Sequence, residues 1–380
     1  MAEMVRKRLD SLDGLRGVAA CAVLVHHMYQ QYYLAVTGIH YQFFDWLGTW
    51  GVSVFFVLSG FCIHYPQALK RRQGVKNLNY RRFALNRMLR IVPAYYFALL
   101  ICLLAGRFVE TNLISKSASF GDIVGHLLFL HDTFPSGLHS INAVFWTIAV
   151  EMQFYIIYAS IYKFIKFNLN WLVVFFIIGI TWYGIFSALL SSDDQWRVIF
   201  QTLPVVTFWS WYLGALIAKW TVEGKILADL GCNNRFYYIF VIIVIAANFV
   251  ICIGDPTLFR LHLKYWIVPF LCGLLILTLV TGELHNRFGI VLKGLRTLGL
   301  ISYSLYLLHP VGILLALNCS WILGFTVNSM ESQLMALFFS IALATGSYLF
   351  VEKPFLELKR RLGTIDSELV RKQSELLLVK

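Results

Sequence analysis

An arginine and a histidine share one face of the first apolar segment of this chain. The stretch LDGLRGVAACAVLVHH places Arg16 eleven residues before His27. In an α-helix these side chains lie about 20° apart around the axis and roughly 16 Å apart along it, whereas His26 points about 100° away. The spacing offers a permanent cation at one level and a proton-accepting imidazole at another. A hydrogen-bonded core histidine, with an arginine that reaches the lipid headgroups, explains the same pattern.

Two other segments hold charged residues in apolar surroundings. Arg87 and Arg90 share a helix face in NRMLRIVPAYY, and arginine forks bind phosphate, although by themselves the pair fits lipid anchors better. Glu151 stands within the apolar run FWTIAVEMQFYIIY, where a carboxylate is costly and therefore a functional candidate. We expect Glu151 at the depth of His27, where it would orient and stabilise the imidazole. A structural tie between helices is the alternative.

A further set of polar residues fits a structural role better, as hydrogen-bonding groups between helices. His309 lies in ISYSLYLLHPVG together with Tyr303, and Ser59 lies among small residues in GVSVFFVLSGFCI. The candidates for a supporting role at a site are Asp13, Ser59, Tyr303 and His309. The seven cysteines have no paired metal-ligand spacing, so we expect no metal site.

The composition indicates that these residues belong to a membrane protein. Hydrophobic residues make up 59% of the 380 residues and charged residues only 14%, which is far more apolar than a soluble domain requires. Runs of about 20 apolar residues, the length that crosses a bilayer as a helix, recur along the chain. We therefore predict an all-α polytopic bundle of about ten transmembrane helices. They are expected near residues 15–36, 44–65, 88–106, 143–162, 171–190, 198–218, 236–254, 263–282, 297–318 and 333–351.

The segments between the expected spans indicate the orientation of the bundle, and one of them contains a further helix. Basic residues alternate from one connection to the next, so both termini are predicted to be cytoplasmic. This pattern also explains the net charge of +12 without a nucleic-acid partner. The long connection at 107–142 contains DIVGHLLFLHD, which is expected to be a short helix packed on the bundle rather than an interfacial helix. Residues 1–360 would form one transmembrane domain, and 361–380 a polar cytoplasmic tail.

Taken together, these fragments resemble the acyltransferase 3 family of integral-membrane acyltransferases. In the family's opening motif an arginine precedes a histidine by eleven positions, which corresponds to Arg16 and His27. GVSVFFVLSGFCI, RMLRIVPAYY, FWTIAVEMQFY, SYSLYLLHP and VEKPF resemble further landmarks in the same order. Within FWTIAVEMQFY, Glu151 matches the first of two adjacent acids, and Met152 replaces the second. The resemblance extends from residue 12 to about residue 360.

The resemblance implies acyl transfer across a membrane. The family moves an acyl group, commonly acetyl, from cytoplasmic acyl-CoA to a hydroxyl, usually of a sugar. It implies catalytic roles for His27 and Glu151, contacts of Arg16, Arg87 and Arg90 with the donor, and no metal. His27 would act as the general base or would itself carry the acyl group. The expected location is a cytoplasmic membrane, the inner one in a bacterium.

The expected acceptor is a cell-envelope or secreted glycan, reached directly or through an extracytoplasmic partner protein. A non-enzymatic transporter of a polar solute or a lipid-linked glycan is the alternative, since buried polar residues also line transport paths. The transporter alternative rests only on the presence of buried polar residues. In addition, the sequence has no evident internal repeat of the kind that many transporters contain.

Overall fold

The computed structural model describes residues 2–32, 39–108, 113–115, 118–165, 167–190, 194–224, 264–281 and 289–362. Within these residues the secondary structure is helical throughout, and no strand is present. The helices are α1 (Ala2–Tyr32), α2 (Ile39–Arg72), α3 (Tyr80–Gly106), α4 (Phe120–Leu127), η1 (His131–Thr133), α5 (Pro135–Leu138), α6 (Trp146–Ile161), α7 (Leu169–Leu189), α8 (Asp194–Thr202), α9 (Pro204–Glu223), α13 (Lys264–Thr281), α14 (Gly289–Leu323), α15 (Met330–Ser347) and the π-helical turn η4 (Tyr348–Glu352).

The predicted all-α membrane bundle agrees with these helices. Nine of the ten expected segments overlap described helices, although the one near 198–218 is divided at Leu203 between α8 and α9. The segment near 236–254 lies outside the described residues. Among the described residues, five stretches are long and apolar enough to cross a bilayer: Phe43–Arg72, Tyr80–Gly106, Leu169–Leu189, Leu295–Leu323 and Met330–Leu362. Ten crossings and cytoplasmic termini stay predictions, and the tail beyond residue 362 lies outside the described part.

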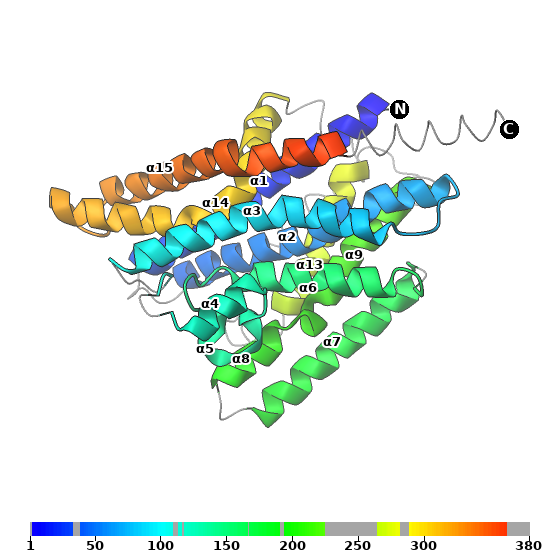
Figure 1. Ribbon diagram of the computed structural model, residues 1–380, viewed down its shortest axis with the longest axis horizontal. Helices are drawn as coiled ribbons and strands as arrows, with labels where there is room; N and C mark the ends of the chain where they lie inside the picture. Colours follow the sequence, from blue (N-terminus) through cyan, green and yellow to red (C-terminus); the bar gives the residue numbers. More distant parts are fainter. Residues whose placement is uncertain are drawn as a thin grey trace.

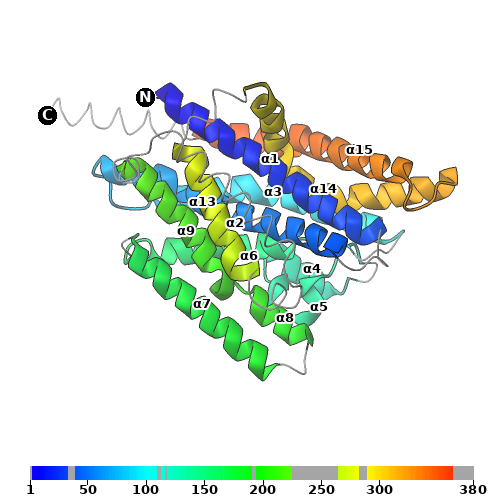
Figure 2. The ribbon, with the colours of Figure 1, turned by 180° about the vertical axis from the view of Figure 1, so that it is seen from behind.

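The central helices are related by contacts that fix their directions. Gly17 of α1 lies against Gly299 of α14, and His27 stacks on His309 ten residues farther along, so α1 and α14 run parallel. Gly51 of α2 lies against Ala19 of α1, while Phe44 lies beside His26, so α2 runs antiparallel to both. Figures 1 and 2 show α14 and α15 side by side along one side of the bundle, with α7 along the opposite side.

Glycine allows the backbones of α2 and α9 to touch. A Cβ atom added at Gly60 would collide with the carbonyl of Trp211, and one added at Gly214 would collide with the carbonyl of Val57. Lipid tails are as apolar as the helices, so no hydrophobic force drives membrane helices together. They associate instead through close packing of small residues. The small residues at the end of GVSVFFVLSGFCI thus have the packing role that their composition predicts.

The long connection between α3 and α6 folds onto the bundle, as expected. α4 begins with a capping box in which the Ser119 hydroxyl accepts from the Asp122 amide at 3.0 Å and Asp122 accepts from the Ser119 amide at 2.9 Å. His126 at its end is fully buried, and its Nδ1 lies 3.0 Å from the Tyr95 hydroxyl of α3. Burial lowers the pKa of His126 to about 2, so the imidazole there is neutral.

Candidate functional site

A cavity of about 90 Å³ brings together the arginines that the sequence singled out. It lies between α1, α2, α3, α6 and α14, and its lining includes Arg16, Arg87, Arg90 and Glu151. Arg16 is more than seventy positions from the other two arginines in the chain, so only the packing of α1 and α3 against α14 brings them together. This space is called the arginine cavity below.

Two of the three arginines already have carboxylate partners. Arg90 forms an ion pair with Glu352, whose side chain is 1% exposed and also accepts from Ser304 at 2.9 Å. Arg16 donates to Asp13, three residues earlier on the same helix, at 3.3 Å. These pairs fix the guanidinium groups in position and neutralise part of their charge.

Arg87 differs because no described carboxylate pairs with it. Its Nε is buried and makes no hydrogen bond within the described part of the chain. Its guanidinium lies 5.8 Å from the centre of the Tyr155 ring, a weak cation–π contact. An arginine in this state has donors to spare, so Arg87 is the cation of the arginine cavity best able to bind an anion.

Glu151 is held by hydroxyl groups on the arginine side of the bundle. Its Oε1 accepts from Ser59 at 2.7 Å and from Tyr155 at 2.5 Å. Ser59 also accepts from the indole of Trp211 at 3.2 Å, so the network connects α2, α6 and α9. The supporting candidate Ser59 therefore contacts the acid directly.

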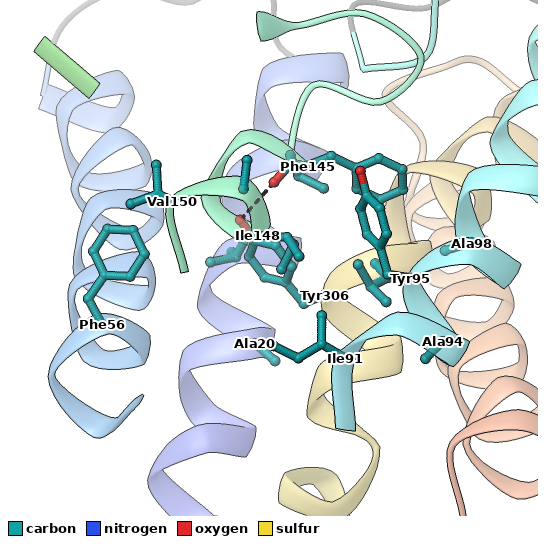
Figure 3. Close-up of a cluster of buried hydrophobic side chains, with 14 of the residues drawn as sticks. Ala20, Phe56, Ile91, Ala94, Tyr95, Ala98, Phe145, Ile148, Val150 and Tyr306 are labelled. Atoms are coloured by element: carbon teal, nitrogen blue, oxygen red, sulfur yellow. Dashed lines mark hydrogen bonds between the residues drawn. The ribbon is translucent and has the colours of Figure 1, made fainter. Parts of the chain in front are cut away.

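A second cavity, of about 210 Å³, contains both histidines of the opening stretch. It lies between α1, α2, α9 and α13, and the residues that begin α6 also contribute. His26 and His27 line it, and we call it the histidine cavity. Val52, Phe56 and Tyr306 line both cavities and form a shared wall between them. Figure 3 shows Tyr306 of α14 in the core, with Phe56 of α2 on one side and Tyr95 of α3 on the other.

The two histidines are bonded differently. His27 Nδ1 lies 3.0 Å from the amide oxygen of Gln30, which can only accept, so Nδ1 carries the proton and Nε2 carries the lone pair. His27 Nε2 makes no hydrogen bond among the described residues. The His26 ring, in contrast, donates from Nδ1 to the carbonyl of Phe44 at 2.8 Å, which attaches α1 to α2. His27 is thus the histidine whose lone pair is available to a reactant.

The expected pairing of Glu151 with His27 is wrong. The two residues line different cavities, and their hydrogen bonds go to other partners. The depth estimate took residue 143 as the outer end of the span, whereas Ala143 and Val144 already line the histidine cavity inside the bundle, and α6 begins only at Trp146. Thr147, in its first turn, already contacts Tyr306 of the shared wall at 2.7 Å. Glu151 lies one turn farther along and is therefore on the arginine side.

Tyr303 lines the arginine cavity, whereas His309 lines neither cavity and instead contacts His27. Tyr303 donates to the carbonyl of Ile91 at 3.1 Å and lies 5.7 Å from the Arg90 guanidinium. His309 is fully buried and stacks on His27 with ring centres 5.1 Å apart. His309 Nδ1 donates to the carbonyl of Tyr306 at 2.8 Å, which holds the His309 ring in its stacking position against the His27 ring.

Sequence reasoning missed Glu352 and Tyr155, and it counted Tyr306 only among the hydroxyls with a structural role. Glu352 lies in VEKPF, a landmark whose acid carries no predicted role. Tyr155 follows Glu151 by four residues, and this helical spacing is a signal that could have found it. Tyr306 carries no such signal, because only the tertiary packing places it between two cavities.

Comparison of the sequence with known proteins identifies a family and several relatives. The acyltransferase 3 family, described as an acyltransferase domain, matches residues 9–352. Peptidoglycan O-acetyltransferase OatA of Listeria monocytogenes is 29% identical over 215 residues, 52% of this chain and 32% of that protein. O-acetyltransferase OatA of Staphylococcus aureus is 24% identical over 371 residues, 91% of this chain and 57% of that protein.

A third relative extends the range of organisms. Acyltransferase MdmB of Streptomyces mycarofaciens is 31% identical over 164 residues, 42% of this chain and 40% of that protein. The chain thus spans between about a third and just over half of the length of these three relatives. No solved structure matches the chain.

Proposed function

This chain belongs to the acyltransferase 3 family, and from that premise we propose that it is a membrane O-acyltransferase. It transfers an acyl group, with acetyl as the expected one, from acyl-CoA to a hydroxyl of a cell-envelope or secreted glycan. One observation carries the proposal: an arginine-lined cavity and a cavity with an open histidine lone pair share a wall. Such an arrangement brings an anionic donor and a hydroxyl acceptor to opposite sides of one transfer point.

The donor is assigned to the arginine cavity. The phosphates of CoA require cations, and Arg87 has guanidinium donors without a partner in the described chain, with Arg16 and Arg90 beside it. A cavity of about 90 Å³ holds a slender chain rather than a nucleotide. The pantetheine arm would therefore enter, with the nucleotide outside at the end of the bundle where Arg87 lies.

His27 is the proposed general base. A hydroxyl attacks a thioester carbonyl poorly until its proton has an acceptor, and a neutral imidazole is suited to that role near pH 7. Nε2 takes the proton as the acceptor oxygen bonds to the carbonyl carbon. The carbon–sulfur bond then breaks, and the imidazolium returns the proton to the departing CoA sulfur. Gln30, rather than Glu151, keeps the ring in the required tautomer.

Glu151 has a revised role in this proposal. Its carboxylate holds the hydroxyls of Ser59 and Tyr155 and lies in the same cavity as three guanidinium groups. It offsets part of their charge and orders the wall along which the donor enters. Loss of Glu151 is therefore expected to impair donor binding.

The acceptor class is supported by the relatives. The Listeria monocytogenes protein is named a peptidoglycan O-acetyltransferase, which makes a sugar polymer of the cell envelope the first acceptor to test. With the donor on the cytoplasmic side, the histidine cavity would be reached from the opposite face. Reporter fusions after Lys166 and Lys380 should then read cytoplasmic, and a fusion after Ser192 should read external. A reversed reading at any of these positions would contradict the topology.

The test of the function uses the purified full chain in detergent with acetyl-labelled acetyl-CoA and glycan acceptors. We expect acetylated glycan and free CoA in equal amounts. Arg81→Ala provides a matched control, because this exposed arginine begins α3 but lines neither cavity. Uptake of a glycan or solute into proteoliposomes, without any acetyl transfer, would establish a transporter instead.

A further inference from the structure

The histidine cavity has polar residues that the proposed transfer of a proton and an acyl group does not use. Asp45 of α2 lines it and makes no hydrogen bond or ion pair with any described residue. Thr207 of α9 also lines it, is 6% exposed, and has a buried hydroxyl without a partner in the described chain. Polar groups at a cavity surface without partners inside the protein are typical of a ligand-binding wall.

Other residues of the same cavity have the chemistry of a sugar site. Trp146 and Tyr265 contribute aromatic side chains to the lining, and such rings offer an apolar body with a polar edge. Ser53 and Ser210 donate their hydroxyl protons to carbonyls of their own helices, at 2.8 and 2.6 Å. Their oxygen lone pairs therefore stay available as acceptors for a ligand's hydroxyl protons.

The charge of this cavity is opposite to that of its neighbour. Its described lining contains the carboxylate of Asp45 and no lysine or arginine, whereas the arginine cavity has three guanidinium groups. A hydroxyl donor is attracted to an unpaired carboxylate, and a second carboxylate or a phosphate is repelled by it.

We propose that the histidine cavity binds a neutral polyol, of which one hydroxyl meets His27 Nε2 and a neighbouring hydroxyl donates to the Asp45 carboxylate. Thr207 and the aromatic rings hold the rest of the sugar. The inference rests on the proposed function and deepens it, since it assigns the acceptor site and its selectivity. Acceptors with a negative charge next to the reacting hydroxyl are excluded by Asp45.

The test measures acceptor binding without any acyl donor. Saturation-transfer titrations of the full chain in detergent would compare methyl glucoside with methyl glucuronide, its anionic counterpart. Wild-type protein should bind the glucoside more tightly. Asp45→Ala should weaken glucoside binding by about tenfold, the value of a charge-assisted hydrogen bond. Asp45→Asn keeps an accepting oxygen, so it should weaken glucoside binding less and should abolish the discrimination against glucuronide.

A matched pair on α9 provides the control. Thr207→Val should weaken glucoside binding a few-fold, while Thr221→Val should have no effect. Thr221 lies on the same helix, bonds the carbonyl of Ile217 at 2.8 Å and lines neither cavity. Both substitutions keep the branched shape, so a difference between them reports the hydroxyl of Thr207.

Two results would overturn this assignment. The first is equal binding of both glycosides by wild-type protein and by both Asp45 variants. The second is a preference for methyl glucosaminide that both variants lose to the same extent, which would indicate a cationic acceptor. Because binding is measured without donor, a protein that discriminates at Asp45 but transfers no acetyl group would refute the proposed function alone.

Discussion

The two cavities differ in how their polar groups are satisfied. In the arginine cavity, Arg90 pairs with a buried Glu352, and Glu151 joins Ser59 and Tyr155. In the histidine cavity, Asp45 and Thr207 have no such partners in the described chain. Polar residues of the first cavity therefore hold helices together as well as facing a ligand. In the second cavity, Asp45 and Thr207 face a ligand without such contacts, whereas His26 attaches α1 to α2. Stability and activity should therefore separate at Asp45, Thr207 and His27, but not at His26.

The largest expected effect follows removal of the base. His27→Ala should lower transfer by about 10²–10⁴-fold, the usual contribution of a positioned general base. Acyl-CoA binding should be retained and thermal stability should fall only modestly, because among the described residues the ring gives up one hydrogen bond, to Gln30, and its stacking on His309. Rates of acetyl transfer, with melting curves of the same samples, would measure both.

The neighbouring residue provides the control for this prediction. His26→Ala should keep substantial activity but lower stability, since it removes the bond to the Phe44 carbonyl. Near-normal transfer by His27→Ala would refute the catalytic role. Acetyl label that stays on wild-type protein in the absence of acceptor would replace the general base with an acyl-histidine intermediate.

Breaking the buried ion pair should have the largest effect on stability. Glu352→Gln leaves the Arg90 guanidinium without its carboxylate, and the loss of one partner of a buried pair destabilises by about 3 kcal/mol. Chemical denaturation in detergent would measure the free energy of unfolding. Glu357→Gln is the matched control, because its 3.8 Å contact with Arg360 is at the surface and should be worth less than about 1 kcal/mol. Equal losses in both variants would contradict the comparison.

Within the arginine cavity, substitution of Arg87 should weaken donor binding without lowering the stability of the protein. Arg87→Ala is expected to weaken acyl-CoA binding by about 1.5–3 kcal/mol, the value of a hydrogen bond to a charged group. Unfolding should be nearly unchanged, because Arg87 has no ion pair in the described structure. Arg87→Lys should restore binding only in part, since lysine lacks the planar fork. Unaltered affinity in Arg87→Ala would remove this residue from the donor site.

The smallest effect concerns the connection outside both cavities. Burial lowers the pKa of His126 to about 2 and that of His131 to about 4, and raises the pKa of Asp132 to about 6. Both histidines therefore bind protons more readily in the unfolded chain, and stability falls as the pH drops from about 6.5 towards 4. Protonation of Asp132 in the folded protein opposes this in part between about pH 6 and 4. The net loss should be roughly a few degrees in melting temperature between pH 7 and 5.

Substitution of His126 tests whether this residue causes part of the loss of stability at low pH. His126→Gln removes one of the two groups that take up protons on unfolding, so the melting temperature should depend less steeply on pH. Melting curves at several pH values would measure the slope, whatever the variant does to stability at pH 7. An unchanged slope would assign the acid sensitivity to another part of the chain.

The sequence predicted what depends on local periodicity. The eleven-residue spacing of Arg16 and His27 correctly separates a cation from an imidazole along one helix, and the two side chains line adjacent cavities. Nine of the apolar runs overlap described helices, since twenty consecutive apolar residues have few alternatives to a membrane helix, but the break between α8 and α9 at Leu203 was not predicted. Arg87 and Arg90 were placed on one face, and both line the same cavity.

Contacts between helices could not be predicted from local spacing in the sequence. The depth of Glu151 depends on where α6 begins, and the irregular turn before it, with a positive φ of 61° at Ile141, shortens the helix at that end. The Arg90–Glu352 pair joins residues 262 positions apart, and no spacing rule relates them. Asp45 carries no signal in the sequence, because an acid near the end of a span is ordinary; only the cavity beside it distinguishes this residue.

The glycine contacts described for α2 and α9 have a consequence for how substrates enter. Backbone touches backbone where α14 meets α1, where α1 meets α2 and where α2 meets α9, and a Cβ at Gly299, Gly51 or Gly60 would clash there. Helices in such direct contact cannot slide or separate without losing most of their packing. These four helices therefore form a fixed frame around the shared wall. Any widening that admits a bulky donor or sugar must come from displacement of the remaining walls, α3, α6 and α13.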